Sequence, residues 1–466
     1  MKALFNTVEK TTIPLDLPSE GISMWEQPGF PQMDYGAFQM RGPCVSKALQ
    51  EAFVEAQKDR PTFHANLMEE RKGFFYGQWW HVRPEPARLK IVDFRNLPTL
   101  PEDIDAWVHA QMNPLVMRGQ NLLKEYAVSF RLFLLPREHQ ILVFMFHHVV
   151  TDGAGLYDFL RDTFSLYHRK VKNREPDWAN TPGIHAQSKK NITEPISPFR
   201  YFLRSYRTDM QHPFKNASQL ASLPERSKGR VMIRHIITDL KEQKAFRTRA
   251  RADGGSVTDL FMAASKLAMQ EFNDSRNTST EILTHGLAVN LRGRMSPSEI
   301  HAMGNPMSAI ILPTNRRERH DPQALLRLIV QRRMLMLHDG YDIAVNRVMQ
   351  SISRKTRFLP STYRYPLMRL VLDWPISFFL TNLGVVWPRM ENGRPTGETA
   401  ITHVGEMELV DVHSSVSPTK NNALAMILRT FLGRFYCVFA VGLNKISEKD
   451  AKEFSRLILG KARSYL

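Results

Sequence analysis

Cysteine is scarce in this 466-residue chain, and its scarcity excludes several kinds of protein. The two cysteines, Cys44 and Cys437, stand far apart in the sequence and belong to no C-x-x-C pair. This arrangement argues against a disulfide scaffold, a cysteine zinc site and a redox pair. A reducing compartment fits such a chain, so we expect a cytoplasmic protein.

The sequence also lacks a long, uninterrupted apolar run. The N-terminal stretch MKALFNTVEKTTIPLDLPSE is too polar for a signal peptide, and we interpret it as an ordered or loosely attached arm. The most apolar stretch, residues 367–387, contains Arg369, Asp373, Pro375 and Asn382, which argue against a membrane span. We therefore expect a protein that is soluble or attached peripherally to a membrane.

Acidic residues are outnumbered, since 63 lysines and arginines face 46 aspartates and glutamates, a net charge of +17. Such a charge suggests an anionic partner, for which nucleic acid, a lipid surface, a phosphorylated cofactor and an acidic protein are alternatives. A solvated basic surface is the simpler interpretation. There is no basic tail, RNA-binding aromatic signature or zinc-finger spacing, so we expect no nucleic acid. Basic and aromatic residues alternate in RKTRFLPSTYRYPLMR, residues 354–369.

The length of the chain exceeds what one hydrophobic core usually serves, so two lobes are expected. Apolar residues at helical spacing over 45–56 predict an early helix. A strand over 126–135, a polar turn and a strand over 141–148 predict a β-hairpin, and helical spacing returns after residue 153. These elements form the first predicted lobe.

A second series of elements follows a stretch from about residue 170 to 227 that has no periodicity and is rich in proline, asparagine, serine and basic residues. We place the crossover between the lobes there. Ser256 and Asp259 have capping-box spacing at the start of a predicted helix. The other predicted elements are strands at 231–240, 282–290, 376–386, 400–412, 423–429 and 435–442, helices between 322 and 368, and a last helix from 447. The two comparable series indicate an α/β protein.

The stretch FMFHHVVTDG, residues 144–153, ends an apolar strand with two adjacent histidines. Because successive side chains of a strand point to opposite faces, His147 and His148 cannot both enter one core. One of them is therefore a candidate for chemistry. A hydrogen-bonded pair of core histidines remains the simpler alternative.

Two kinds of catalytic site fit this stretch poorly. A metal site would need further ligands, but the two rings diverge and no third histidine or carboxylate follows at a familiar ligand spacing. A serine hydrolase would need G-x-S-x-G, which is absent, since GISMW at residue 21 lacks the closing glycine. We expect neither a metal nor a covalent serine.

A histidine can also act as a general base without a covalent intermediate. A neutral imidazole at the mouth of a cleft can take the proton of an alcohol or amine as that group attacks a carbonyl. Asp152, four residues after His148, could accept hydrogen bonds or pair with an arginine to hold the turn in shape. Gly153 permits a close approach of the backbone.

HHVVTDG, residues 147–153, resembles the H-H-x-x-x-D-G signature of the CoA-dependent acyltransferase superfamily. This group includes nonribosomal-peptide condensation domains, polyketide-associated acyltransferases, plant BAHD enzymes and wax ester synthase/diacylglycerol acyltransferases. The plant branch is a poor match because D-F-G-W-G is absent. Other similar segments follow in the expected order: GSVTDLFMAAS at 255–265, AVNLRGR at 288–294, MGNPMSAIILP at 303–313 and FFLTNLG at 378–384.

The resemblance implies an α/β fold of two chloramphenicol-acetyltransferase-like lobes, which form a V with an active-site tunnel between them. We accordingly expect an N-terminal lobe over residues 1–190, a crossover linker over 191–227 and a C-terminal lobe over 228–466. Matched by motif position, His148 is the expected general base. His147 and Asp152 are then mainly structural members of the catalytic motif, which Gly153 completes.

The resemblance also implies residues outside the histidine motif. Arg292 is the expected partner of Asp152, and Arg294 is the reserve. Thr381 stands where the family usually has serine and keeps a hydroxyl group. The residues expected to support the oxyanion or the structure of the site are Arg292, Thr381, Asn382 and Asn305.

The activity that the resemblance implies is acyl transfer from a thioester to a hydroxyl or amine, in lipid or secondary-metabolite biosynthesis. O-acyl transfer is favoured because the N-L-R and G-N segments are closer to the ester-forming branches. Acyl-CoA or a phosphopantetheinyl acyl carrier protein would be a co-substrate, with no permanently bound cofactor and no metal. The alternative is a non-catalytic scaffold of the same fold that binds a carrier protein or lipid. An anionic membrane surface could be a further partner.

Overall fold

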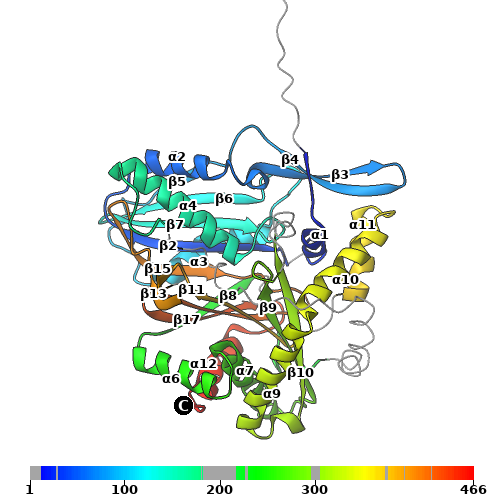
Figure 1. Cartoon of the computed structure of the whole chain (residues 1–466). Coiled ribbons are helices and arrows are strands. Elements are labelled where there is room, and N and C mark those ends of the chain that lie inside the picture. Colours follow the sequence, from blue (N-terminus) through cyan, green and yellow to red (C-terminus); the bar gives the residue numbers. More distant parts are fainter. Residues whose placement is uncertain are drawn as a thin grey trace, which may run out of the picture.

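A computed structural model describes residues 12–27, 30–179, 181, 217–225, 229–294, 305–372, 376–392, 394–420 and 422–466. Strands and helices of these residues form two lobes, each built on a six-stranded sheet (Figure 1). The first lobe is in the upper part of the view and the second in the lower part.

The sheet of the first lobe has the strand order β14-β15-β2-β7-β6-β5. Its middle contains the predicted hairpin, in which β6 and β7 pair antiparallel from Val128 opposite Phe146 to Leu135 opposite His139. The hairpin prediction is thus confirmed. The strands of this sheet are β2 (Met33–Arg41), β5 (Leu89–Asp93), β6 (Val128–Leu135), β7 (His139–His147), β14 (His403–Val404) and β15 (Met407–Ser415).

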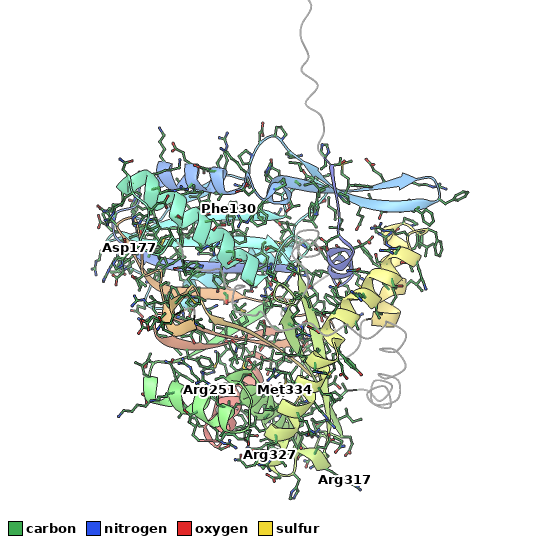
Figure 2. All side chains as sticks on the ribbon, in the orientation of Figure 1. Phe130, Asp177, Arg251, Arg317, Arg327 and Met334 are labelled. Atoms are coloured by element: carbon green, nitrogen blue, oxygen red, sulfur yellow. The ribbon has the colours of Figure 1, made fainter. Side chains whose placement is uncertain are left out.

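The side chains on the two faces of β7 pack in different cores, because successive side chains of a strand point to opposite faces. Phe144 and Phe146 pack with α2 (Ser46–Ala56) and α4 (Gly153–Lys172), and Phe130 of β6, labelled in Figure 2, lies in the same core. On the opposite face, Val143 and its neighbours pack with α3 (Ile104–Arg118). The chain therefore leaves β7 between two filled cores, at the position of the paired histidines.

The sheet of the second lobe has the order β10-β9-β11-β16-β17-β8. The predicted capping box is present, since Ser256 and Asp259 bond each other's backbone N–H at the start of α7. Helices α7 and α12 pack on this sheet in one apolar cluster. The elements are β8 (Arg230–Ile237), β9 (Ile282–Asn290), β10 (Met307–Asn315), β11 (Phe378–Val385), β16 (Leu424–Phe431), β17 (Arg434–Gly442), α6 (Leu240–Ala252), α7 (Val257–Asp274), α9 (Pro322–His338) and α12 (Glu448–Arg463).

Two strands from the C-terminal part of the sequence belong to the sheet of the first lobe. Strand β15 pairs antiparallel with β2, and β14 extends the same sheet at its edge. The chain therefore returns to the first lobe after building most of the second. The division into 1–190, 191–227 and 228–466 stays a prediction, and most of the linker lies outside the described residues.

The helix α6 was not predicted, and the strand expected over 231–240 ends earlier, at Ile237. The side chain of Asp239 accepts a hydrogen bond from the N–H of Lys241 and so begins the helix. The segment LKEQKAFRTRARA buries only Gln243, Phe246 and Ala250. Its apolar stripe is too sparse to register as helical periodicity.

A smaller layer of elements extends from the two lobes. In it, β1 (Thr12–Pro14), β4 (Phe75–Val82) and β3 (Ala65–Lys72) form a three-stranded sheet. The helices α10 (Tyr341–Lys355) and α11 (Ser361–Leu372) end the region predicted as helical, and α10 contacts α1 (Leu17–Ser23). Strands β12 (Pro388–Glu391) and β13 (Arg394–Thr399) form a separate ribbon, and short 3-10 turns occur at Pro61–His64 and Arg317–Arg319. Within the described residues, every helix is too short or too polar to cross a bilayer.

Candidate active site

His148 follows the last residue of β7, where the chain leaves the sheet of the first lobe. Its side chain is 14% exposed, and its Nε2 lies 3.3 Å from Oδ2 of Asp34 on the neighbouring strand β2. The backbone N–H of His148 donates to the carbonyl oxygen of Gln32 over 2.9 Å, which fixes the residue against the start of that strand. The ring is thus held in place but keeps contact with solvent.

Asn305 brings the second lobe to this histidine, from a position two residues before β10. Its Nδ2 lies 2.9 Å from Nδ1 of His148, 2.6 Å from the carbonyl oxygen of His148 and 3.3 Å from that of Thr151. Asn305 is fully buried. One amide group therefore holds the histidine turn of the first lobe against the second lobe.

His147 points the other way and is enclosed by the protein. Its Nδ1 accepts a hydrogen bond from the N–H of Val149, and its Nε2 lies 2.9 Å from Oε2 of Glu26. The ring is fully buried. Since both ring nitrogens have partners, His147 fixes the turn and offers no nitrogen to a substrate.

Asp152 connects the helix after the turn to the second lobe. Its Oδ1 accepts the N–H of Gly155 over 2.7 Å and so caps α4, while its Oδ2 lies 2.6 Å from Nη1 of Arg292. Arg292 comes two residues after β9. The reserve candidate, Arg294, instead pairs with Asp342.

Two glycines let other groups approach the first turn of α4 closely. A Cβ on Gly153 would lie 3.4 Å from the side chain of Leu383 on β11, which is a tight but ordinary contact. A Cβ on Gly155 would collide with Oγ1 of Thr151 and come within 3.1 Å of Arg292. Gly155, which the sequence reasoning did not single out, therefore makes room for the Asp152–Arg292 pair.

Thr381 and Asn382 lie on β11, where that strand passes the start of α4. The amide of Asn382 donates to Oγ1 of Thr258 over 2.8 Å and accepts the N–H of Gly384 over 2.8 Å. Thr381 is half-buried and pairs with Ile427 of β16. No contact of either side chain with His148 occurs among the interactions of the described residues, so their role at the oxyanion stays a prediction.

The sequence reasoning also missed Asp34, which is 2% exposed. Its Oδ1 accepts a hydrogen bond of 2.6 Å from Ser417 and lies 3.9 Å from Nη1 of Arg230, the first residue of β8. Burial lowers the pKa of the Arg230 guanidinium, although the charge of Asp34 opposes this shift. An acidic residue in the apolar stretch MDYGAFQMR was a signal, but the strand that contains it was not predicted.

The arrangement of potential metal ligands also bears on the chemistry of the site. No group of three or more histidine, cysteine, aspartate and glutamate side chains that could hold a metal ion occurs within the described ranges. Around His148 the site contains an imidazole, a carboxylate and an amide group at the junction of the two lobes.

A sequence model of the condensation domain matches residues 35–288, which is more than half of the chain. Among solved structures, the chain is similar to the trichothecene 15-O-acetyltransferase TRI3 of Fusarium sporotrichioides, with a TM-score of 0.69 and 11% identity over 100% of this chain and 97% of that one. It is also similar to a variant of the starter condensation domain of rhizomide synthetase in complex with C8-CoA and Leu-SNAC, with a TM-score of 0.64 and 13% identity over 98% and 94%.

A third similar structure is the epimerization domain from the third module of tyrocidine synthetase B, with a TM-score of 0.61 and 13% identity over 98% of each chain. At these identities the likeness shows the fold alone. The expected fold of two chloramphenicol-acetyltransferase-like lobes is confirmed, whereas the tunnel between them stays a prediction. Because proteins of different activity share this fold, the reaction must be argued from the site.

Proposed function

Because this chain belongs to the condensation-domain family, we propose that it is an acyltransferase, which moves an acyl group from a thioester to a hydroxyl or amine. The observation that carries the proposal is the setting of His148, whose partly exposed imidazole lies between the carboxylate of Asp34 and the amide of Asn305. An imidazole held in this way can accept and return one proton.

In the proposed reaction the reactive tautomer of His148 carries its hydrogen on Nδ1 and accepts the acceptor's proton at Nε2. In this tautomer the 2.9 Å contact between Nδ1 and the amide nitrogen of Asn305 is not a hydrogen bond, because both groups are donors. The acceptor oxygen or nitrogen forms a bond to the thioester carbon, and the carbonyl oxygen takes the negative charge. When the tetrahedral intermediate collapses, the carbon–sulfur bond breaks and the thiolate leaves with the proton from Nε2. Throughout this reaction, the two hydrogens of the Asn305 amide are donated to the carbonyl oxygens of His148 and Thr151.

Asp34 has an electrostatic role in this scheme. Proton transfer makes an imidazolium, whose Nε2–H lies beside Oδ2 of Asp34. A separation of 3.3 Å exceeds the roughly 2.7–2.9 Å of a charge-assisted hydrogen bond, so Nε2 is not committed to the carboxylate before the reaction. A buried negative charge at this distance stabilises the imidazolium and therefore the transition state.

The oxyanion needs hydrogen-bond donors that the histidine turn does not already use. The first N–H groups of a helix have no partner within the helix, so those of Gly153 and Ala154 at the start of α4 are candidates. Thr381 and Asn382 of β11 are the side-chain candidates. Asn305 is better suited to orient His148 than to bind the oxyanion, because its amide nitrogen already lies within hydrogen-bond distance of the carbonyl oxygens of His148 and Thr151.

The donor in this proposal is acyl-CoA or an acyl carrier protein, and basic residues would attract the phosphates or the acidic carrier. The acceptor is a small alcohol or amine, and we favour an alcohol. The rival function is a non-catalytic scaffold that binds a carrier protein or lipid. A scaffold does not need an imidazole that is partly exposed beside a buried carboxylate.

Thiol release tests the proposed function directly. The purified chain is mixed with acyl-CoAs of short to long chain length, and pooled alcohols or amines are added or omitted. Acceptor-dependent release of thiol supports acyl transfer and identifies the class of donor and acceptor. If thiol is released from none of the acyl-CoAs and from none of the acyl carrier proteins tested, the proposal is contradicted and the scaffold is favoured.

The charge of Asp34 should affect kcat more than KM. Asp34→Asn keeps an oxygen that can accept the hydrogen bond from Ser417 but removes the negative charge beside His148. We expect kcat to fall by about tenfold to a hundredfold, which corresponds to about 1.4–2.7 kcal/mol of lost transition-state stabilisation. Steady-state kinetics with saturating donor measure the effect.

The matched control for Asp34 is Asp411→Asn, because Asp411 is also a buried carboxylate of this sheet but pairs with Arg234. The control should keep kcat. An unchanged kcat in Asp34→Asn, or an equal fall in both variants, would remove Asp34 from the mechanism.

A further inference from the structure

The hairpin of β3 and β4 extends away from the first lobe (Figure 1, upper right). Two phenylalanines at its turn are exposed. Gly73 forms its turn with a φ of +64°, and Phe74 and Phe75 follow directly, 83% and 58% exposed. Single exposed apolar residues are common on soluble proteins, but grouped ones mark sites of interaction. The hairpin tip is therefore a candidate contact surface.

A second group of exposed apolar residues lies beside this hairpin, on α11 and the turn before it. Phe358 is 56% exposed, Tyr363 69% and Leu367 40%. Hydrogen bonds join the groups: for example, the N–H of Tyr76 donates to the carbonyl of Arg357 over 2.7 Å, and the N–H of Ser361 donates to the carboxylate of Glu69 over 3.1 Å. We call Phe74, Phe75, Phe358, Tyr363 and Leu367 together the aromatic surface.

The rim of the aromatic surface is mainly basic. Arg71, Arg354 and Lys355 are exposed beside it. Glu70 is an exposed acidic residue of β3, whereas the carboxylate of Glu69 is already bound to Ser361 and lies 3.7 Å from Arg364. Positive charge alone would not mark this surface, because Figure 2 also places the side chains of arginines at the outside of the second lobe, namely Arg251, Arg317 and Arg327. The distinguishing feature is the combination of cations with protruding aromatic rings.

We propose that the aromatic surface binds the headgroup region of an anionic lipid bilayer. Aromatic side chains favour the interface between water and hydrocarbon, and basic residues beside them are attracted to anionic lipids. A bilayer accepts rings that protrude from a hairpin tip, as Phe74 and Phe75 do. A protein partner would need a complementary surface of about 800 Å² on each side, for which a protruding tip offers little contact area.

The aromatic surface is also connected to the histidine turn. Arg369 of α11 donates to the carbonyl of Met24 over 2.9 Å, and two residues later Glu26 binds the buried ring of His147. Lipid binding by α11 would therefore occur at the side of the protein from which α1 and Glu26 reach the site. This link to acyl transfer depends on the proposed function, whereas the lipid binding itself does not.

Vesicle sedimentation of the full chain tests the proposal. We expect binding to vesicles of phosphatidylcholine with phosphatidylserine, weaker binding to phosphatidylcholine alone, and loss of binding at high salt. Phe74→Ser/Phe75→Ser should lower the partition coefficient by about tenfold or more, because two aromatic side chains lose apolar contact. Arg354→Gln/Lys355→Gln should lower binding to the anionic vesicles by about tenfold.

The chain offers closely matched controls in the second lobe. Leu223 and Leu240 are 81% and 66% exposed, so Leu223→Ser/Leu240→Ser removes a similar apolar surface elsewhere. Lys241→Gln/Lys244→Gln removes two exposed charges from α6. Both control variants should bind vesicles like the wild type.

Three results would overturn the proposal. These are failure of the wild type to sediment with anionic vesicles, equal binding by the phenylalanine variant, and an equal loss in the leucine control. If the phenylalanine variant loses acyl transfer from an acyl carrier protein but keeps vesicle binding, the aromatic surface binds the carrier protein instead of lipid. Thiol release from a water-soluble acyl-CoA should be unchanged in every variant, so a failure of lipid binding is distinguishable from a failure of acyl transfer.

Discussion

The His148→Ala variant is expected to lose acyl transfer almost completely, with kcat/KM lower by about 10²- to 10⁴-fold. The reason is that the variant has no group in place of Nε2 to take the acceptor's proton. The fold should survive, because the ring is in contact with solvent, so that water can enter the space it leaves and hydrate Asp34. The fall in kcat/KM is measured by thiol release, with the donor and acceptor that the wild type uses.

The adjacent histidine provides the matched control for this substitution. His147 is fully buried, and its removal leaves Glu26 and the N–H of Val149 without their partner. We expect His147→Ala to lower the melting temperature more than His148→Ala does. Two variants with the same stability and the same activity would contradict the assignment of one histidine to chemistry and the other to structure.

The elements around His148 were largely predictable from local sequence. The β6–β7 hairpin and the helices α2 and α4 have clear apolar periodicity, and most of the apolar residues that the pattern picks out are buried, although Val45 is 47% exposed. The alternation of side chains along β7 also predicts that His147 and His148 point in opposite directions. The periodicity of apolar residues and the residue types of a turn are local properties of the chain, so both can be recognised in a single sequence.

The environment of His148 could not be read in the same way. Asp34, Asn305 and His148 come from three distant parts of the chain and meet only because β2 lies beside β7 and the second lobe closes on the turn. No spacing in the sequence encodes these contacts. Arg292 was named only through a resemblance of segments, and the structure places its guanidinium beside Asp152.

The same limit applies to α6 and to the strands of the first sheet that were missed. The segment of α6 buries few apolar residues and therefore has weak periodicity. Strand β2 is buried over most of its length, so it shows no polar alternation. Its partners, β7 and β15, lie far away in the sequence, and β15 follows most of the second lobe.

A large stability effect should come from breaking the buried pair of Asp152 and Arg292, whose side chains are 7% and 13% exposed. Arg292→Met removes the guanidinium that neutralises the buried carboxylate of Asp152. We expect the free energy of unfolding to fall by about 3–5 kcal/mol, because removing one member of a buried ion pair is costly. Chemical denaturation of the wild type and the variant measures the difference.

A second substitution at Asp152 should recover much of this loss. Asparagine caps a helix about as well as aspartate, so Asp152→Asn keeps an acceptor for the N–H of Gly155 but removes the charge that Arg292 neutralises. In the double variant Arg292→Met/Asp152→Asn the buried charge is absent. We therefore expect the double variant to be more stable than Arg292→Met alone, with a coupling energy of about 1–3 kcal/mol.

Arg294 supplies the control for this cycle, because it lies two residues away and pairs with Asp342 instead. Arg294→Met should destabilise the protein on its own, but Asp152→Asn should add to that loss rather than relieve it. Rescue of Arg294→Met by Asp152→Asn, or additivity of Arg292→Met with Asp152→Asn, would refute the specific pairing. The Asp152–Arg292 contact joins the cap of α4 to the end of β9, so its coupling energy measures how firmly the second lobe is held against the turn that carries His148.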